Sequence, residues 1–276
     1  MKKKIILAIL IISSFLYSKE VAVISSFNSL HLGWKGKSYY DLASVISLFD
    51  LVGLEEVMKE DGLSLLKNEL EKITGEKWSY CISEHSVGNS KRYQEYYGYI
   101  WKDKKVKLTK KLGFYKEHNP KDLSREPYGA NFEIGEFDFS FILMHSIFGD
   151  KKMQRENEAK FLDEIYDYFQ EKNGSEQDVL IGGDFNIPAY DKAFLEILNH
   201  KDNIFYGIDP TNKTTIGKRG LVSSYDNIFY SYKYTKEFTG NSGVYDFTNK
   251  NYSTIRKRVS DHLPVFMEFN INKDDD

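Results

Sequence analysis

Short apolar runs alternate along the chain with stretches in which apolar residues recur every three or four positions. The apolar runs predict strands, and the periodic stretches predict amphipathic helices. Strands are expected at 20–28, 50–57, 78–84, 96–102, 107–117, 178–186, 223–232 and 263–271, with a hairpin over 129–148 that turns at Gly135. Helices are expected at 37–49, 63–74 and 153–172. This alternation indicates an α/β class, and its mixture of hairpins and crossovers favours more than one sheet.

Many of the predicted strands end on, or begin after, a polar residue that their hydrophobicity does not explain. These residues are Asn28, Glu56, His145, Asp184, Asn186, Asp226, Asp261 and His262. A single polar residue at such a position usually caps a turn or meets water. So many carboxylates, amides and imidazoles in equivalent places exceed what capping requires, and loops at strand ends are where rigid scaffolds place functional side chains.

The candidate side chains divide into oxygen ligands and imidazoles. Oxygen ligands favour Mg²⁺, Mn²⁺ or Ca²⁺ over zinc, and the residues that offer them include Asn28, Glu56, Asp184, Asn186 and Asp261. His145 and His262 can transfer protons near neutral pH. A hard divalent cation with imidazoles can hydrolyse a phosphate ester, because the cation neutralises phosphoryl charge while a base and an acid move protons. The sequence contains no Gly-rich P-loop, GxSxG elbow or HExxH motif that would indicate another chemistry.

Seven motifs, in chain order, resemble those of the endonuclease/exonuclease/phosphatase superfamily, and in particular its deoxyribonuclease I-like members. They are "SFN" with Asn28, "LEEV" with Glu56, "SREP" with Arg125, "LMHS" with His145, "GGDFN" with Asp184 and Asn186, "YDNIF" with Asp226, and "SDHLPV" with Asp261 and His262. The segment "RYQEYYGYIW" is similar to a Tyr-x-Glu-x-Tyr segment of the nuclease. The resemblance runs from about residue 21 to residue 269. It implies a four-layer α/β/β/α sandwich of two packed mixed sheets flanked by helices, with the site at one edge between the sheets.

The resemblance also implies a role for each matching residue. Glu56 would be the principal metal carboxylate, helped by Asn28 and Asp261. Asp184 and Asn186 would hold the attacking water, a second metal or the scissile phosphate, which His145 and His262 would flank. Glu95 would orient His145, and Asp226 would orient His262. Arg125 and Tyr93 would contact the backbone or groove of DNA.

Two positions depart from the nuclease pattern. After "EEV" the nuclease has an arginine that enters the minor groove, whereas this chain has Met58. An apolar side chain cannot read the groove potential as arginine does. Glu55 stands where the superfamily usually has glutamine, and it is expected to add a negative charge beside the metal site.

Composition sets further bounds. The 276 residues carry a formal charge of −3, so global charge does not attract a polyanion, and any phosphate substrate needs a local basic patch or a metal. Cys81 is the only cysteine, which excludes an intramolecular disulfide. Three lysines followed by an apolar run from Ile5 to Ile12 predict a signal peptide over residues 1–18. One domain over 19–276 is expected, as a monomer that is secreted or periplasmic and not stably inserted in a membrane.

The leading functional hypothesis is an exported, divalent-metal-dependent endonuclease that hydrolyses DNA, with Mg²⁺ as the expected ion and Mn²⁺ or Ca²⁺ as alternatives. The alternative is a phosphoesterase on the same fold that acts on lipid or small phosphate esters, similar to a sphingomyelinase or a phosphoinositide phosphatase, because a fold does not fix its substrate. A binding subunit without activity is a third class, disfavoured because every expected catalytic side chain is present.

Overall fold

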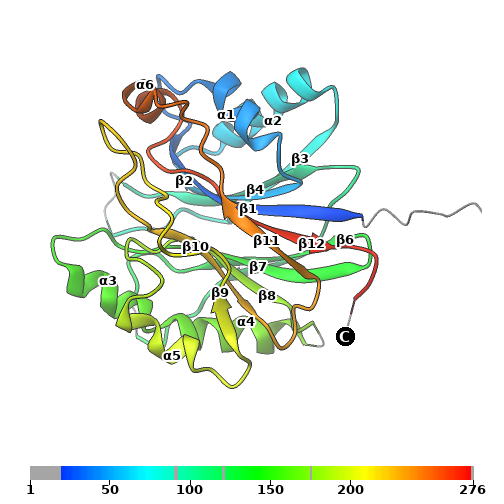
Figure 1. The fold of residues 1–276 in the computed structure, drawn as a ribbon. Helices are drawn as coiled ribbons and strands as arrows, with labels where there is room; N and C mark the ends of the chain where they lie inside the picture. Colours follow the sequence, from blue (N-terminus) through cyan, green and yellow to red (C-terminus); the bar gives the residue numbers. More distant parts are fainter. Residues whose placement is uncertain (1–19, 90–92, 120–121, 175, 275–276) are drawn as a thin grey trace, which may run out of the picture.

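The computed structural model describes residues 20–89, 93–119, 122–174 and 176–274. Two mixed sheets face each other, and helices cover their outer faces (Figure 1). The predicted signal peptide, residues 1–18, lies outside the described residues. Within the described residues, no helix is both long and apolar enough to cross a bilayer.

The first sheet has the order β11-β12-β1-β2-β4-β3, and the second has the order β5-β6-β7-β8-β10-β9. The strands of the first are β1 (Val21–Leu32), β2 (Leu51–Val57), β3 (Trp78–Ile82), β4 (Tyr96–Lys102), β11 (Phe238–Val244) and β12 (Val265–Asn270). The strands of the second are β5 (Lys107–Phe114), β6 (Tyr128–Ile134), β7 (Phe137–His145), β8 (Val179–Asp184), β9 (Ile204–Tyr206) and β10 (Asp226–Ser231).

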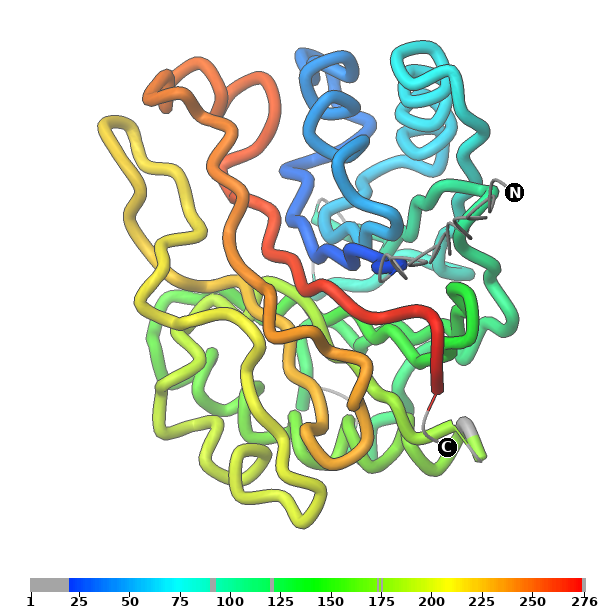
Figure 2. Tube along the Cα trace, turned by 45° about the vertical axis from the view of Figure 1, so that its right-hand side comes forward, coloured from blue at the N-terminus to red at the C-terminus, as the bar shows by residue number. Residues whose placement is uncertain are grey.

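The helices form the two outer layers. Over the first sheet lie α1 (Tyr39–Ile46), α2 (Asp61–Thr74) and α6 (Tyr252–Arg258), and over the second lie α3 (Lys152–Ala159), α4 (Leu162–Asn173) and α5 (Leu195–Leu198), with the short 3-10 helix η1 (Lys192–Phe194) before α5. The Cα trace in Figure 2 shows the same separation of layers from a second direction. The predicted four-layer α/β/β/α sandwich is confirmed.

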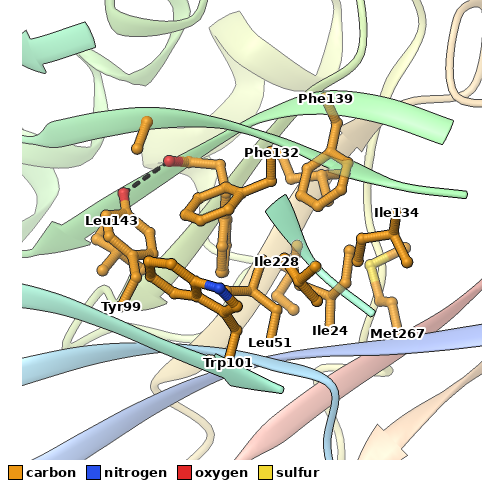
Figure 3. Close-up of a cluster of buried hydrophobic side chains, with 14 of the residues drawn as sticks. Ile24, Leu51, Tyr99, Trp101, Phe132, Ile134, Phe139, Leu143, Ile228 and Met267 are labelled. Carbon is orange, nitrogen blue, oxygen red and sulfur yellow. Dashed lines mark hydrogen bonds between the residues drawn. The ribbon is translucent and has the colours of Figure 1, made fainter. Parts of the chain in front are cut away.

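The layer between the sheets is rich in aromatic residues. Side chains from both sheets meet there (Figure 3), among them Ile24, Leu51, Trp101, Phe132, Phe139 and Leu143. The Tyr99 hydroxyl, buried in this layer, donates to the backbone oxygens of Tyr128 at 2.9 Å and Phe141 at 2.7 Å. A buried hydroxyl needs such acceptors, so these bonds join β4 of one sheet to β6 and β7 of the other.

The structure corrects three expectations about elements. The helix expected at 153–172 is two helices, α3 and α4, that break around Lys160 and Phe161. The first strand does not end at Asn28 but continues to Leu32, with a register irregularity against β2. The short elements β9, β11, α5 and α6 were not predicted. The hairpin turn at Gly135 is confirmed, since Ile134 pairs with Phe137 across it.

Candidate active site

Strand register places three of the predicted residues in a row at one edge of the second sheet. His145 is opposite Asp184 in the parallel pairing of β7 with β8, and Asp226 is opposite Asp184 in the antiparallel pairing of β10 with β8. The side chains of directly paired residues point to the same face of a sheet. The register therefore brings an imidazole and two carboxylates together from segments far apart in sequence.

The first sheet faces this row with its own polar residues. Asn28 of β1 pairs with Glu55 of β2, and Glu56 follows with a left-handed backbone, φ +57°. That conformation is uncommon for a residue with a side chain, and it accompanies the register irregularity between β2 and β4. Both sheets contribute to one open cavity of about 480 Å³, lined among others by Glu56, His145, Asp184, Asn186, Asp261 and His262.

His145 is held from behind by a carboxylate. Its Nδ1 lies 2.7 Å from Glu95 Oε1, while the other oxygen of Glu95 lies 3.1 Å from Nε of Arg125. Burial and Arg125 lower the pKa of His145, but the carboxylates of Glu95 and Asp184 outweigh them and the net pKa is raised. The Nε2 of the ring, 3.6 Å from Asp184 Oδ2, faces the cavity.

His262 has a matching arrangement from the opposite side. Its Nδ1 lies 2.9 Å from each oxygen of Asp226, and its Nε2 lies 3.4 Å from Asp184 Oδ2. Burial lowers the pKa of His262, but the carboxylates of Asp226 and Asp184 raise it by more. The net pKa is well above its ordinary value. The backbone N–H groups of Tyr225 and Asp226 both donate to Thr214 Oγ1, which fixes the loop that precedes β10.

The two imidazoles therefore converge on a single carboxylate oxygen, Asp184 Oδ2. Each ring has its Nδ1 anchored by a buried carboxylate, and each presents its Nε2 toward the cavity. A carboxylate at Nδ1 fixes the tautomer and the orientation of a catalytic imidazole. This geometry suits two N–H groups that contact one small anion, such as a phosphate.

The predicted oxygen ligands lie on the side of the cavity formed by the first sheet. Asn28 Nδ2 donates to Glu56 Oε1 at 3.1 Å and to Asp184 Oδ2 at 3.2 Å, so this amide bridges carboxylates of the two sheets. Asp261 also lines the cavity, and Arg256 Nη2 lies 3.2 Å from its Oδ2. The carboxylates of Glu56, Asp184 and Asp261 thus line the cavity. Because they would repel a phosphate, a positive charge must lie beside them before a phosphate can bind. The donor set consists of hard oxygens, which fits a divalent cation. Asp184, Asp226 and His262 also bring ligand atoms within 4.8 Å of one another.

Asn186 and Phe148 form the side of the cavity above the second sheet. Asn186, with φ +56°, donates from Nδ2 to the backbone oxygen of Ser146 at 2.8 Å, and its own N–H donates to Asp184 Oδ1 at 3.0 Å. Phe148 is 63% exposed and stacks with the guanidinium of Arg155, whose Nη1 donates to the Asn186 carbonyl at 3.4 Å. The position of Asn186 is therefore fixed on both sides.

Two known proteins are similar to this chain in sequence. A deoxyribonuclease of Thioalkalivibrio sp. (strain K90mix) is 26% identical over 283 residues, which cover 97% of this chain and 75% of that protein. The endonuclease/exonuclease/phosphatase family domain-containing protein 1 of Xenopus laevis is 27% identical over 248 residues, covering 81% of this chain and 44% of that protein. No protein-family model matches the chain.

Two solved structures have a similar fold. An endonuclease/exonuclease/phosphatase family protein of Bacteroides thetaiotaomicron superposes with a TM-score of 0.59 at 16% identity, over 90% of this chain and 97% of that one. A mannosyl-6-phosphatase of the same organism also superposes with a TM-score of 0.59 at 16% identity, over 89% and 98%. The fold is that of the endonuclease/exonuclease/phosphatase superfamily. The resemblance to its deoxyribonuclease I-like members, predicted from seven motifs, is confirmed.

The resemblance assigned Arg125 and Tyr93 to contact with DNA, but neither residue lines the cavity. Arg125 is largely buried, and its guanidinium is directed to Glu95 and to the His145 carbonyl, 3.4 Å from Nη1. It therefore lies behind His145, and its direct contact with DNA stays a prediction. Tyr93 is 47% exposed and does not line the cavity, although it lies two residues from Glu95.

Glu55, which stands where the superfamily usually has glutamine, does not line the cavity. Its side chain is fully buried and points between the sheets, where Ser26 Oγ donates to Oε1 at 2.9 Å. Burial raises the pKa of Glu55 well above its ordinary value, and Asp226 raises it further. Burial therefore opposes the extra negative charge that is expected beside the metal site.

Three residues to which the resemblance gave no role contact the residues of the site. Lys37 donates to the backbone oxygens of Ser29 at 2.7 Å, Val259 at 2.6 Å and Leu30. Burial lowers its pKa to about 8, against the opposing effect of Glu56 and Asp261. His31 contacts Glu56 Oε2 through Nε2 at 3.3 Å and stacks on Trp34, and Ser260 Oγ donates to the Asn28 carbonyl at 2.7 Å. No motif marks Lys37 or His31, because their contacts depend on the course of the chain after Asn28. Ser260 is the first residue of the "SDHLPV" motif, but the resemblance gave it no role.

Proposed function

We propose that this chain is a divalent-metal-dependent endonuclease that hydrolyses phosphodiester bonds of DNA. The observation that carries the proposal is the convergence of two carboxylate-anchored imidazoles on Asp184 Oδ2, beside a group of hard oxygen ligands. The relative named deoxyribonuclease, which aligns over nearly the whole chain, supports DNA as the substrate.

The mechanism assigns a role to each group in the cavity. Glu56, with Asn28 and Asp261, would hold the cation, and a bound divalent ion would supply charge neutralisation at the phosphoryl oxygens. His145 and His262 would donate from Nε2 to those oxygens, which their raised pKa values favour. One of them would protonate the leaving oxygen.

Asp184 and Asn186 complete the mechanism. Asp184 Oδ2 lies between the two imidazoles and would accept a proton from the attacking water. The Asn186 amide, fixed by Ser146, would hold the phosphate or that water.

A nicking assay tests this proposal. Supercoiled plasmid, RNA and sphingomyelin are each incubated with the purified protein and Mg²⁺, Mn²⁺, Ca²⁺ or a chelator. We expect plasmid nicking that the chelator abolishes. Glu56→Gln should lose nicking and bind Mg²⁺ more weakly by calorimetry, whereas Glu136→Gln, at the exposed turn between β6 and β7, should retain both. Hydrolysis of sphingomyelin without nicking would favour the lipid phosphoesterase, and full nicking by Glu56→Gln would place the metal elsewhere.

We also propose that the protein is exported and processed. The lysine cluster and apolar run at the start of the chain support this. In the structure, Val21 pairs with Asn270, and the Glu20 carbonyl accepts from Ile271 N–H at 3.1 Å. Cleavage after Ser18 would leave these contacts intact. Mass spectrometry of the native protein should give an N-terminus between Ser14 and Val21, and an intact Met1 on protein found outside the cytoplasm would contradict export.

A further inference from the structure

A charged hairpin stands at the edge of the cavity. Ile216 and Leu221 form a β-bridge, Gly217 N–H donates to the Gly220 carbonyl at 2.8 Å, and the tip between them consists of the exposed Lys218 and Arg219. The base of the hairpin belongs to the site, since Thr215 bridges to His262 and Ile216 N–H donates to the Asp261 carbonyl at 2.6 Å. The two cations are thus held on a short, anchored arm.

Helix α6 brings a second group of cations to the same side. Its last turn is Arg256, Lys257 and Arg258, all exposed, and it ends three residues before Asp261. Arg256 lines the cavity and contacts Asp261, while Arg258 pairs with Asp41 at 3.1 Å. In Figures 1 and 2 the yellow loop that holds the hairpin and the orange α6 extend from the same side of the molecule.

Charge is sharply segregated in these two segments. Residues 212–225 contain three Lys or Arg, residues 247–260 contain four, and neither contains Asp or Glu. Together they carry 3 + 4 = +7, although the whole chain has a formal charge of −3, so the remainder of the chain carries −10. A concentration of cations beside the cavity, on an otherwise acidic protein, marks a local surface for a polyanion.

We propose that the hairpin tip and the last turn of α6 form one docking surface for the phosphate backbone of DNA flanking the scissile phosphate. This inference rests on the proposed function and adds where and how the strand is held. Its cations would contact phosphates of the backbone, which position a duplex without reading its sequence. The tip is Gly-Lys-Arg-Gly and so has no aromatic or leucine side chain of the kind that anchors an amphipathic helix in a lipid surface, although Val222 beside it is exposed.

The test removes the two tip charges and measures binding apart from chemistry. Lys218→Ser/Arg219→Ser is compared with Lys201→Ser/Lys236→Ser, which removes two exposed lysines near the other end of β10, the end away from Asp226. Fluorescence anisotropy with a duplex oligonucleotide in chelator, from 50 to 200 mM salt, gives affinity and its salt dependence. The rate of hydrolysis of bis(p-nitrophenyl) phosphate with metal measures the activity of the catalytic groups alone, because this small diester has no flanking DNA strand.

For the tip variant we expect the slope of log K against log salt to fall by about 2, one for each phosphate that the tip no longer neutralises. Its KM for plasmid should rise about tenfold, because the same two phosphates are left without a cation, while small-diester hydrolysis stays unchanged. Lys218→Arg/Arg219→Lys should restore binding, and the control pair should match wild type.

An unchanged salt slope, or equal loss in the control pair, would overturn the docking surface while leaving the nuclease intact. A wild-type protein that neither binds nor nicks DNA would instead overturn the proposed function, and preferential binding to phosphatidylserine vesicles would assign the surface to anionic lipid.

Discussion

Glu55 and Glu56 are adjacent in sequence, but their environments differ. Glu55 lies an even number of residues from Leu51 on β2, so both side chains point to the same face, and Glu55 is buried between the sheets. The side chain of Glu56 is 16% exposed and lines the cavity. Strand alternation sends neighbours to opposite faces, and the left-handed backbone of Glu56 directs its carboxylate to the sheet edge. One of the two carboxyls is thus available for a cation, while the other lies beneath the site.

A pH-dependent stability difference should follow from the burial of Glu55. The pKa of its carboxyl is raised in the folded state, so the folded protein binds more protons than the unfolded chain above the ordinary value of 4.5. Stability from this group is therefore present below that pH and lost as the pH rises toward the folded pKa. Glu55→Gln keeps the acceptor for Ser26 and removes the titration. Relative to wild type, the variant should gain stability as the pH rises above 4.5, measured by urea unfolding with chelator. A pH-independent difference would contradict this burial effect.

The pairing of His262 with Asp226 predicts non-additive effects. Asp226 contacts only the Nδ1 side of the ring, so its contribution to catalysis passes through His262. His262→Ala should reduce plasmid nicking on the order of 10²-fold, the scale for loss of an acid–base group. Adding Asp226→Ala should reduce it little further, because residues that act as a unit are not additive. Fully multiplicative losses would assign Asp226 a separate function.

At the scale of elements, the sequence predicted what depends on local pattern. Gly135 indicated a hairpin turn, and the apolar run over 178–186 indicated β8, because turn chemistry and hydrophobicity are local signals. The break between α3 and α4 lacks such a signal, since the apolar spacing continues across Lys160 and Phe161. The candidate site was predicted through motifs, whereas the contact of Lys37 with Val259 depends on chain paths that no local pattern encodes.

The close approach of β7 and β8 gives a prediction about Gly183. A Cβ at this position would lie 1.8 Å from the backbone oxygen of Met144, which cannot move without shifting the pairing of His145 with Asp184. Gly183→Ala should lower the free energy of unfolding by about 3 kcal/mol or more, at or above the upper end for overpacking a core. Gly220→Ala is the control, because no atom lies within 4 Å of its added Cβ. Equal stability of the two variants, measured by urea unfolding, would show that the strands can separate at little cost.

At the scale of the whole molecule, the candidate site is a seam between two sheets. Asn28 and Glu56 come from the first sheet and Asp184 from the second, and the amide of Asn28 connects them. Repulsion among the carboxylates at this seam opposes the packing of the sheets, while a cation bound there would favour it. Metal binding should therefore be visible in the stability of the whole fold as well as in activity.

Mg²⁺ should raise the melting temperature through this linkage. A ligand that binds only the folded state at a hundred times its Kd adds about 2.7 kcal/mol to the free energy of unfolding, which corresponds to roughly 5–10 °C for a domain of this size. Differential scanning fluorimetry with increasing MgCl₂, against NaCl at equal ionic strength, measures the shift. Glu56→Gln should lose most of it, whereas Glu136→Gln, at the β6–β7 turn, should shift as wild type does. An equal shift in all three proteins would mean that Mg²⁺ acts at another place, and no shift beyond that of NaCl would mean that the seam does not hold the ion.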